Sequence, residues 1–514
     1  MIKTFLNIFS FFDKTHKRYF YFIFCILFLT AILETISIGA FLPLVSTIFD
    51  INNTDQLRIL YENFDEEKVN KFLELKNILL IFASIYLFKF FFLIFCNWHN
   101  KTFEMEVGKI LTKRLYQKYI NLNYENFFEK NSSLMLKNIT SEMRVFVAGL
   151  RAAIFILTEL TVLIFIISFL LFVDFNSSIK IILVLGSFGL IISIFFRGKL
   201  AKWGKQSQQN EGYRAKNFIQ SFLGIKEIKI FNKEVFFSNK LENINNIYFD
   251  SNKKLRFIRS LPKLLLELFL VFCIVTFLFI QSSKTSNFVE ILPLLGIYLA
   301  AAFRVLPSIN VIISHSQYLN FAKPVVDNLK KEFYEEEKKI QSVKNVKISF
   351  KNNILFKNIY YSYPKKKDFL FSDLNFKLNK NESIGLMGAS GSGKTTLINI
   401  ITGLLRPTKG EILLDNKKIS DFQLYKTNLT IGYVPQQTYL LDDTIKNNIA
   451  FGQDEQKIDV KFMKNIIEIV ELEKLINQTG NGIETVIGEK GVKLSGGQIQ
   501  RIGIARALYA KPSL

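Results

Sequence analysis

Long apolar runs separated by charged segments are the main feature of the chain before residue 320. A helix needs about 20 consecutive apolar residues to cross the hydrocarbon core of a bilayer. Six runs approach or exceed this length: 19–49, 77–98, 148–173, 179–196, 261–281 and 287–314. The pattern therefore predicts a polytopic membrane domain of six transmembrane helices.

The segments between these runs differ in charge. The segment 50–76 is acid-rich, whereas 101–147 and 197–260 are long and basic. Because cytoplasmic loops are enriched in Lys and Arg, this asymmetry predicts that both ends of the chain face the cytoplasm. The two basic stretches keep a helical period, so we expect them to continue the membrane helices and to turn at Asn123–Ser133 and Phe222–Glu234.

The pattern changes after a charged segment, 326–345, which is typical of a solvated helix and hinge. From Val346 apolar and polar residues alternate, which predicts antiparallel strands. A short apolar run, Ser383–Met387, favours a buried strand followed by a Gly-rich loop and a helix. We therefore expect a membrane domain over 1–325, a linker over 326–345 and an α/β domain over 346–514.

The overall charge supports a membrane protein rather than a nucleic-acid-binding protein. Lys and Arg outnumber Asp and Glu by 66 to 44, and hydrophobic residues make up 49% of the chain. A nucleic-acid-binding face would gather basic residues with exposed aromatics on one soluble surface. Here the basic residues lie between apolar spans, so no nucleic-acid partner is predicted.

The sequence GASGSGKT, Gly388–Thr395, matches the phosphate-loop pattern in its required context between a strand and a helix. Its glycines let backbone N–H groups converge on phosphates, and the helix N-terminus adds positive potential. We expect Lys394 to reach the β and γ phosphates of ATP and the Thr395 hydroxyl to bind Mg²⁺. The expected ATP-binding residues of this segment are Gly388, Ala389, Ser390, Gly391, Ser392, Gly393, Lys394, Thr395 and Thr396.

About a hundred residues later, the string KLSGGQIQRIGIARALY begins at Lys493 and resembles the signature of ABC ATPases. The signature residues are Leu494, Ser495, Gly496, Gly497 and Gln498. In that family the signature loop of one subunit covers the ATP bound to the other. The resemblance implies Ser495, Gly496 and Gly497 as donors to the γ phosphate, Gln498 as the helix start, and a two-fold homodimer.

The same resemblance extends to two further positions. Tyr363 stands where the family places an aromatic that stacks on adenine, and Gln436 matches a glutamine that contacts Mg²⁺ and senses the membrane domain. The segment Ile487–Lys493 resembles the region that contacts the coupling turns.

The family continues with a Walker B strand, which ends in an Asp for Mg²⁺ and a Glu that activates water, and later with a histidine. This chain ends at Leu514. The resemblance therefore implies an ABC-type ATPase coupled to transport whose domain is truncated at its C-terminus. We expect it to bind ATP, to have no hydrolytic residue within the chain and to lack hydrolysis as given.

Charged residues at membrane depth are costly and indicate function. They include Glu34, Lys89, Glu159, Lys263, Glu267 and Arg304. The alternative is that these charges are structural ion pairs, in which Glu34 pairs with Lys89 across helices and Lys263 with Glu267 one turn apart. Arg304 has no obvious local partner, which predicts a surplus of positive charge facing an anionic headgroup.

The membrane half resembles bacterial flippases for lipid-linked oligosaccharides in the strings ETISIGAFLPL (Glu34–Leu44), NLNYENFFEKNSS (Asn121–Ser133) and LAAAFRVLPSIN (Leu299–Asn310). That resemblance implies a multi-pass protein of the bacterial inner membrane, in contact with membrane lipid, that moves a polyprenyl-pyrophosphate oligosaccharide. It also implies Lys89, Lys263 and Arg304 as the residues that engage the pyrophosphate, although two of them are Lys where the pattern has Arg.

Other functions stay open. One is export of another lipid, a peptide or a drug; another is an inactive truncated fragment with a binding or regulatory role. A non-transporting ABC ATPase acting on ribosomes or DNA is disfavoured by the six apolar spans.

Overall fold

The structure is a computed structural model that describes residues 2–48, 75–130, 132–173, 175–282, 292–334, 350–363, 368–419, 430–488 and 491–514. The chain divides into two compact units. The helical unit comprises Met1–Ile120 and Ser133–Glu337, and the α/β unit comprises Asn121–Ser132 and Lys338–Leu514. Most of the predicted linker lies outside the described residues.

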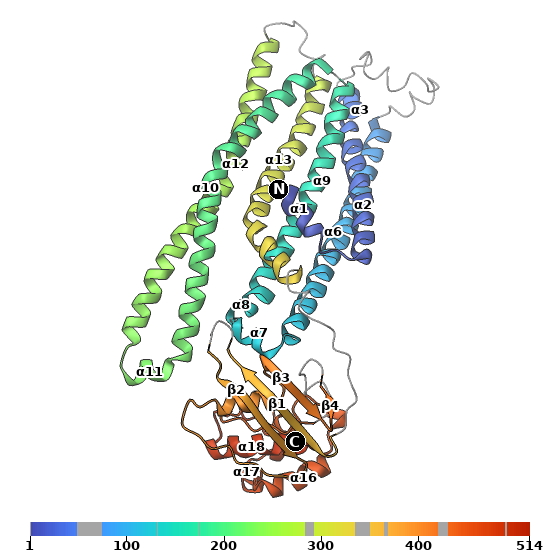
Figure 1. Ribbon diagram of the computed structural model, residues 1–514. Helices are drawn as coiled ribbons and strands as arrows, with labels where there is room; N and C mark the ends of the chain where they lie inside the picture. The colour runs from blue at the N-terminus through green and yellow to red at the C-terminus, as the bar shows by residue number, and fades with distance from the viewer. Residues whose placement is uncertain are drawn as a thin grey trace. The chain divides into compact units, whose positions relative to one another are not determined.

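Long helices make up the helical unit (Figure 1). Its elements are α1 (Ile2–Phe9), α2 (Lys14–Gly39), α3 (Phe41–Ile48), α6 (Leu75–Ile120), α8 (Ser132–Lys137), the π-helix η1 (Asn138–Glu142), α9 (Met143–Val173), α10 (Phe175–Leu223), α11 (Ile225–Ile230), α12 (Glu234–Ser282) and α13 (Leu292–Tyr334). Helices cover the described part of every predicted apolar span.

Within the described part of the chain, four helical stretches are long and apolar enough to cross a membrane. They are Lys14–Val45, Leu75–Ile120, Leu134–Val173 and Tyr298–Tyr334. That α10 and α12 also cross stays a prediction. Helix α6 exposes large apolar side chains, among them Phe88, Phe90 and Phe91, which suit contact with lipid chains.

Two hydrophobic clusters hold the helical unit together. In one, Ala31 of α2, Val162 and Ile166 of α9 and Ala301 of α13 are buried against one another. The other joins α10, α12 and α13 through buried residues that include Ile192, Phe196, Leu255, Leu266 and Ile313. Helix packing therefore fixes α2, α9 and α13 side by side, which brings their polar residues into contact.

The helical continuation of the basic stretches is confirmed. Helix α6 runs for 46 residues, and α10 and α12 run for 49 residues each, well beyond their apolar parts. Short helices stand at both predicted turns: α7 (Tyr124–Glu129) and α11 (Ile225–Ile230).

The α/β unit contains an antiparallel sheet in the order β2-β1-β3-β4. The strands are β1 (Asn353–Tyr361), β2 (Phe371–Asn379), β3 (Lys409–Leu414) and β4 (Lys417–Lys418). Phe356 pairs with Phe376 on one side and with Ile412 on the other, and all belong to one hydrophobic core. The antiparallel strands predicted from Val346 onward are thus confirmed for β1 and β2, and residues 346–349 lie outside the described residues.

Helices surround a second core in this unit. They are α15 (Ile445–Ile449), the 3₁₀ turns η5 (Glu455–Lys457) and η6 (Gly482–Glu484), α16 (Val460–Ile469), α17 (Glu473–Gln478) and α18 (Gly496–Tyr509). Ile445, Ile449, Met463 and Ile502 are fully or almost fully buried in that core. It joins α15, α16 and α18 into one body. Helix α14 (Lys394–Ile401) packs on the core of the sheet through Ile400.

The predicted buried strand Ser383–Met387 is wrong for this structure. The segment is outside the assigned sheet and exposed, with Met387 98% accessible. A buried parallel strand needs neighbours on both edges to satisfy its backbone N–H and C=O groups. Among the described residues no strand pairs with this segment, and its apolar side chains stay uncovered.

The carboxylate of Asp415 ties the β3–β4 turn to the start of β1. It accepts hydrogen bonds from the backbone N–H groups of Lys351 (2.6 Å), Asn352 (2.7 Å) and Asn353 (2.8 Å). Desolvation opposes the charge, but the three N–H donors outweigh it and hold the pKa of Asp415 below its usual value.

We expect Asp415→Asn to destabilise the α/β unit by about 2 kcal/mol, because an amide cannot accept all three hydrogen bonds. A lowered folded-state pKa means that the stabilisation is present above the unfolded value, about 3.9, and is lost as pH falls through the folded value. Thermal unfolding of the full chain in detergent, with hydrogen exchange at Asn353, measures both effects. Asp454→Asn removes a surface ion pair with Lys457 and is the control; equal losses in the two variants contradict the expectation.

Candidate functional site

The phosphate loop lies between the exposed segment 383–387 and α14. Gly391 and Gly393 have φ values of +82° and +94°, a region that glycine adopts without steric cost. A Cβ on Gly393 would lie 2.8 Å from the ring of Phe371, so this position also excludes a side chain. Gly393 is the N-cap of α14, which directs the unpaired N–H groups of the helix start toward the loop.

Lys394 is the first residue of α14, and its side chain folds back over the loop. Its Nζ donates to the carbonyl oxygens of Gly388 and Ala389, both at 2.8 Å. The ammonium is therefore held at the mouth of the loop by two neutral acceptors. A phosphate oxygen is a stronger, charged acceptor for the same group.

Tyr363 lies beside the first turn of α14. Its hydroxyl is 2.7 Å from the Thr396 hydroxyl, and its ring packs edge-to-face on Tyr361. Tyr361 is buried, and desolvation raises its pKa to about 12. Tyr363 is 42% exposed, so it offers an aromatic surface next to the phosphate loop.

The signature loop forms a capping box at the start of α18. The Ser495 N–H donates to Gln498 Oε1 at 2.8 Å, and the Gln498 N–H donates to Ser495 Oγ at 3.4 Å. The helix therefore begins at Gly496 with Ser495 as N-cap, so the expectation that Gln498 starts the helix is wrong by two residues. The first-turn N–H groups of Gly496 and Gly497 have no intrahelical acceptor, and the space around both Cα atoms is open.

Gln436 lies in an exposed bend. In the described part of the α/β unit, no hydrogen bond or ion pair joins Gln436 or Leu494–Gln498 to the phosphate loop. Of the predicted residues, Lys394 and Tyr363 thus lie at the phosphate loop and its helix. Gln436 and the signature loop make no hydrogen bond or ion pair with them in the described residues of one chain. The segment Ile487–Lys493, predicted to contact the coupling turns, includes residues 489 and 490, which are not among the residues that the structure describes.

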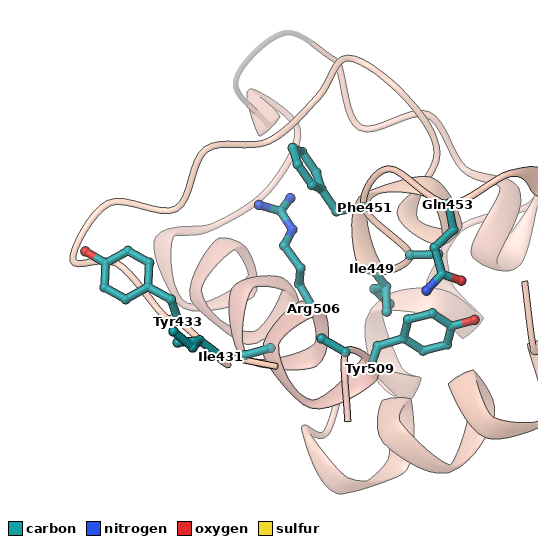
Figure 2. A pocket seen from close by; sticks show the side chains of 10 residues that line it. Ile431, Tyr433, Ile449, Phe451, Gln453, Arg506 and Tyr509 are labelled. Atoms are coloured by element: carbon teal, nitrogen blue, oxygen red, sulfur yellow. The ribbon is translucent and has the colours of Figure 1, made fainter. Parts of the chain in front are cut away.

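Arg506, which sequence reasoning missed, connects α18 to the chain that follows Gln436. Its Nε donates to the Asn448 carbonyl and its Nη1 to the Tyr439 carbonyl, both at 2.9 Å. Figure 2 shows the guanidinium directed toward Phe451, and it lies 4.6 Å from the centroid of that ring. It borders a cavity of about 220 Å³ that Tyr433 and Tyr509 also line. No local spacing marks this role, because both carbonyls are more than 50 residues away.

The first turn between long helices belongs to the α/β unit. Tyr124 of α7 packs against the core that contains Ile354, and Glu125 Oε1 accepts a hydrogen bond from the Arg406 N–H at 2.9 Å. Burial raises the pKa of Tyr124. Helix α7 therefore docks on the same core that carries the phosphate-loop helix.

The structure brings Lys89 and Arg304 together and leaves Lys263 elsewhere. Lys89 Nζ lies 2.7 Å from Glu34, which confirms that pairing. Arg304 is 3.1 Å from both Glu34 and Glu159, which lie on other helices, so the unpaired charge inferred from its lack of a local partner is wrong. Its partners come from α2 and α9, which a search along its own helix cannot find.

Lys263 pairs with Glu267 on α12 at 3.7 Å, as predicted, and both side chains are more than half exposed. The group formed by Glu34, Lys89, Glu159 and Arg304 contains two cations and two carboxylates. The predicted surplus of positive charge is therefore absent from this group.

A phosphate loop, a capped Ser-Gly-Gly helix start and helices long and apolar enough to cross a membrane occur together in this chain. Residues 19–288 match the family model of the ABC transporter transmembrane region, and residues 371–514 match the family model described as ABC transporter. The chain belongs to the ABC transporter family. Proteins of this family couple an ATPase to transport.

Curated relatives match the chain in two ways. Three relatives at 38 to 41% identity align over 31 to 32% of this chain and over only 28% of their own length. A Rickettsia bellii protein named as an export ATP-binding/permease protein is 26% identical over 94% of this chain and 82% of its own length. An ATP-dependent lipid A-core flippase of Alkalilimnicola ehrlichii is 24% identical over 78% of this chain and 68% of its own length.

Among solved structures, a bacterial Atm1-family ABC exporter with ATP bound aligns with a TM-score of 0.74. The alignment covers 97% of this chain and 85% of that chain at 16% sequence identity. This likeness establishes the exporter fold: a helical membrane domain fused to an ABC nucleotide-binding domain.

Proposed function

We propose that the chain is one half of an ATP-driven ABC exporter that moves a lipid-type substrate across the bacterial inner membrane. The observation that carries this proposal is the Gly388–Lys394 loop at the N-terminus of α14, fused to a helical unit with membrane-length apolar helices. The docked α7 turn supports coupling between ATP binding and the long helices, because α6 leads directly into it.

In this mechanism the loop N–H groups and Lys394 bind the ATP phosphates, and the exposed face of Tyr363 stacks on adenine. Within the described residues no cluster of three or more His, Cys, Asp or Glu would hold a metal alone. The Thr395 hydroxyl and the Gln436 amide oxygen suit Mg²⁺ as ligands that complement phosphate oxygens. Bound Mg²⁺ would neutralise phosphate charge.

The second half of the proposal is a two-fold homodimer. The signature loop makes no contact with the phosphate loop in the described residues of one chain. Its open Gly496 and Gly497 N–H groups are free to approach the ATP of a second copy. ATP would then close the two α/β units against each other.

For the substrate we propose a polyprenyl-pyrophosphate oligosaccharide. The resemblance of Glu34–Leu44 and Leu299–Asn310 to flippases of such lipids supports this, as does the relative named as a lipid A-core flippase. Lys89 and Arg304 supply cations at membrane depth that suit a pyrophosphate, and Lys263 is the third proposed contact.

Binding of a fluorescent ATP analogue to the purified full chain in lipid nanodiscs tests the function. We expect saturable binding that tightens about fivefold when a polyprenyl-pyrophosphate glycan is present, because coupling between two sites is reciprocal. Phosphatidylcholine should have no effect. Absence of ATP binding refutes the transporter assignment, and an equal response to a hydrophobic peptide or drug favours the alternative substrate classes.

A further inference from the structure

Four charged side chains from four helices form one group of two buried carboxylates and two partly exposed cations in the helical unit, which we call the ion cluster. Glu34 (α2) contacts Lys89 (α6) and Arg304 (α13), and Arg304 also contacts Glu159 (α9). The three ion pairs measure 2.7, 3.1 and 3.1 Å. Glu34 and Arg304 therefore link α2, α6, α9 and α13.

Two serine hydroxyls complete the ion cluster. Lys89 Nζ donates to Ser37 Oγ at 3.0 Å. Arg304 Nη1 donates to Ser308 Oγ at 2.8 Å, and the Ser308 hydroxyl donates to Glu159 Oε2 at 2.6 Å. These contacts hold the charged groups in one arrangement.

Accessibility differs between the two signs of charge. The side chains of Glu34 and Glu159 are 6% and 11% exposed, whereas those of Lys89 and Arg304 are 15% and 22% exposed. An approaching headgroup therefore meets the cations before the carboxylates. The ring of Tyr86 lies 5.1 Å from Lys89 Nζ and forms an apolar wall beside it.

The ion cluster is neutral as a whole, since two cations face two carboxylates. Each charge taken alone would be costly in the membrane, and the pairing offsets that cost. A neutral group attracts an anion only weakly unless one of its own carboxylates gives way. The planar guanidinium of Arg304 can bind a phosphate through two N–H groups once it is released from Glu159.

We propose that Glu34 and Glu159 are internal counter-ions that occupy Lys89 and Arg304 in this conformation, and that the phosphate of a lipid headgroup displaces them. This inference rests on the proposed function and concerns how the substrate site is regulated. Displacement breaks the links that Glu34 makes from α2 to α6 and α13. Entry of an anionic lipid is thereby coupled to separation of these helices.

The test compares Glu34→Gln and Glu159→Gln with Glu104→Gln in the full chain. Glu104 is a matched control, because it is buried and bridges α6 to Arg151 of α9 at 2.7 Å. It lies 15 residues from Lys89 on α6, about 22 Å along the helix. The probe is a polyprenyl pyrophosphate titrated into phosphatidylcholine nanodiscs, with binding followed by thermophoresis.

Removing either internal counter-ion should lower the half-saturating concentration of the probe about tenfold, within the usual range of coupling between sites. Glu104→Gln should leave it unchanged. The combined variant Glu159→Gln with Arg304→Gln removes a cation and a carboxylate together and should lose the gain. This variant changes two residues of the ion cluster but keeps it neutral. Tighter binding that came from disturbed packing would persist in it, whereas tighter binding that came from a released cation would not.

Unchanged or weaker binding in both single variants, with wild-type binding intact, overturns the counter-ion role and leaves the proposed function standing. If neither the wild type nor any variant prefers the pyrophosphate over phosphatidylcholine, the proposed substrate class fails as well. A gain of equal size in Glu104→Gln also overturns the inference, because it would trace the effect to general loosening of helices.

Discussion

Replacing Lys394 by alanine is expected to weaken ATP binding by about thirtyfold, because a hydrogen bond to a charged group contributes about 2 kcal/mol and every 1.4 kcal/mol changes the affinity tenfold. The side chain is held over the loop by the Gly388 and Ala389 carbonyls, so it is already placed for a phosphate. Its removal takes away the charged contact while the glycine geometry of the loop persists.

The measurement is titration of a fluorescent ATP analogue into the purified full chain in lipid nanodiscs. Lys417→Ala is the control, because Lys417 lies on the exposed strand β4 of the same unit. Both variants should insert into membranes normally. Binding of the ATP analogue by the Lys394 variant with wild-type affinity would exclude the loop as the nucleotide site.

Replacing Arg304 by glutamine is expected to destabilise the helical unit by about 3 kcal/mol, because it leaves two buried carboxylates without their shared cation. Glu34 would keep Lys89, but Glu159 would keep only the Ser308 hydroxyl. Thermal unfolding in detergent should show a clearly lower midpoint.

Lys263→Gln provides the comparison for this prediction. It breaks an ion pair whose members are 62% and 53% exposed, and such pairs contribute about 0 to 1 kcal/mol. Adding Glu159→Gln to the Arg304 variant should recover part of the loss. Equal midpoints for the Arg304 and Lys263 variants would show that the ion cluster does not contribute to stability.

Local features of the nucleotide-binding unit could be predicted because their physics is local. The capping box needs only a serine and a glutamine three residues apart, and the phosphate loop needs glycines at positions with positive φ. The alternation around Phe356 and Phe376 likewise predicted paired strands. The exposed segment Ser383–Met387 differs, because an apolar run reports the tendency to be buried and not whether neighbouring strands are there to cover it.

Interactions between distant parts of the chain could not be predicted in the same way. Arg506 bonds to carbonyls of Asn448 and Tyr439, and backbone acceptors have no signature in the sequence. The docking of α7 by Glu125 on the Arg406 N–H is another backbone contact of this kind.

The sequence by itself determined the long apolar helices, the phosphate loop and the resemblance to ABC ATPases, because apolar runs and glycine-rich motifs act within a few residues. Only the tertiary structure decided which charged side chains pair with one another inside the helical unit. Arg304 meets Glu34 and Glu159 through the packing of α2, α9 and α13 around Ala31, Val162 and Ala301. Coulomb attraction depends on distance in space, and helix packing sets that distance.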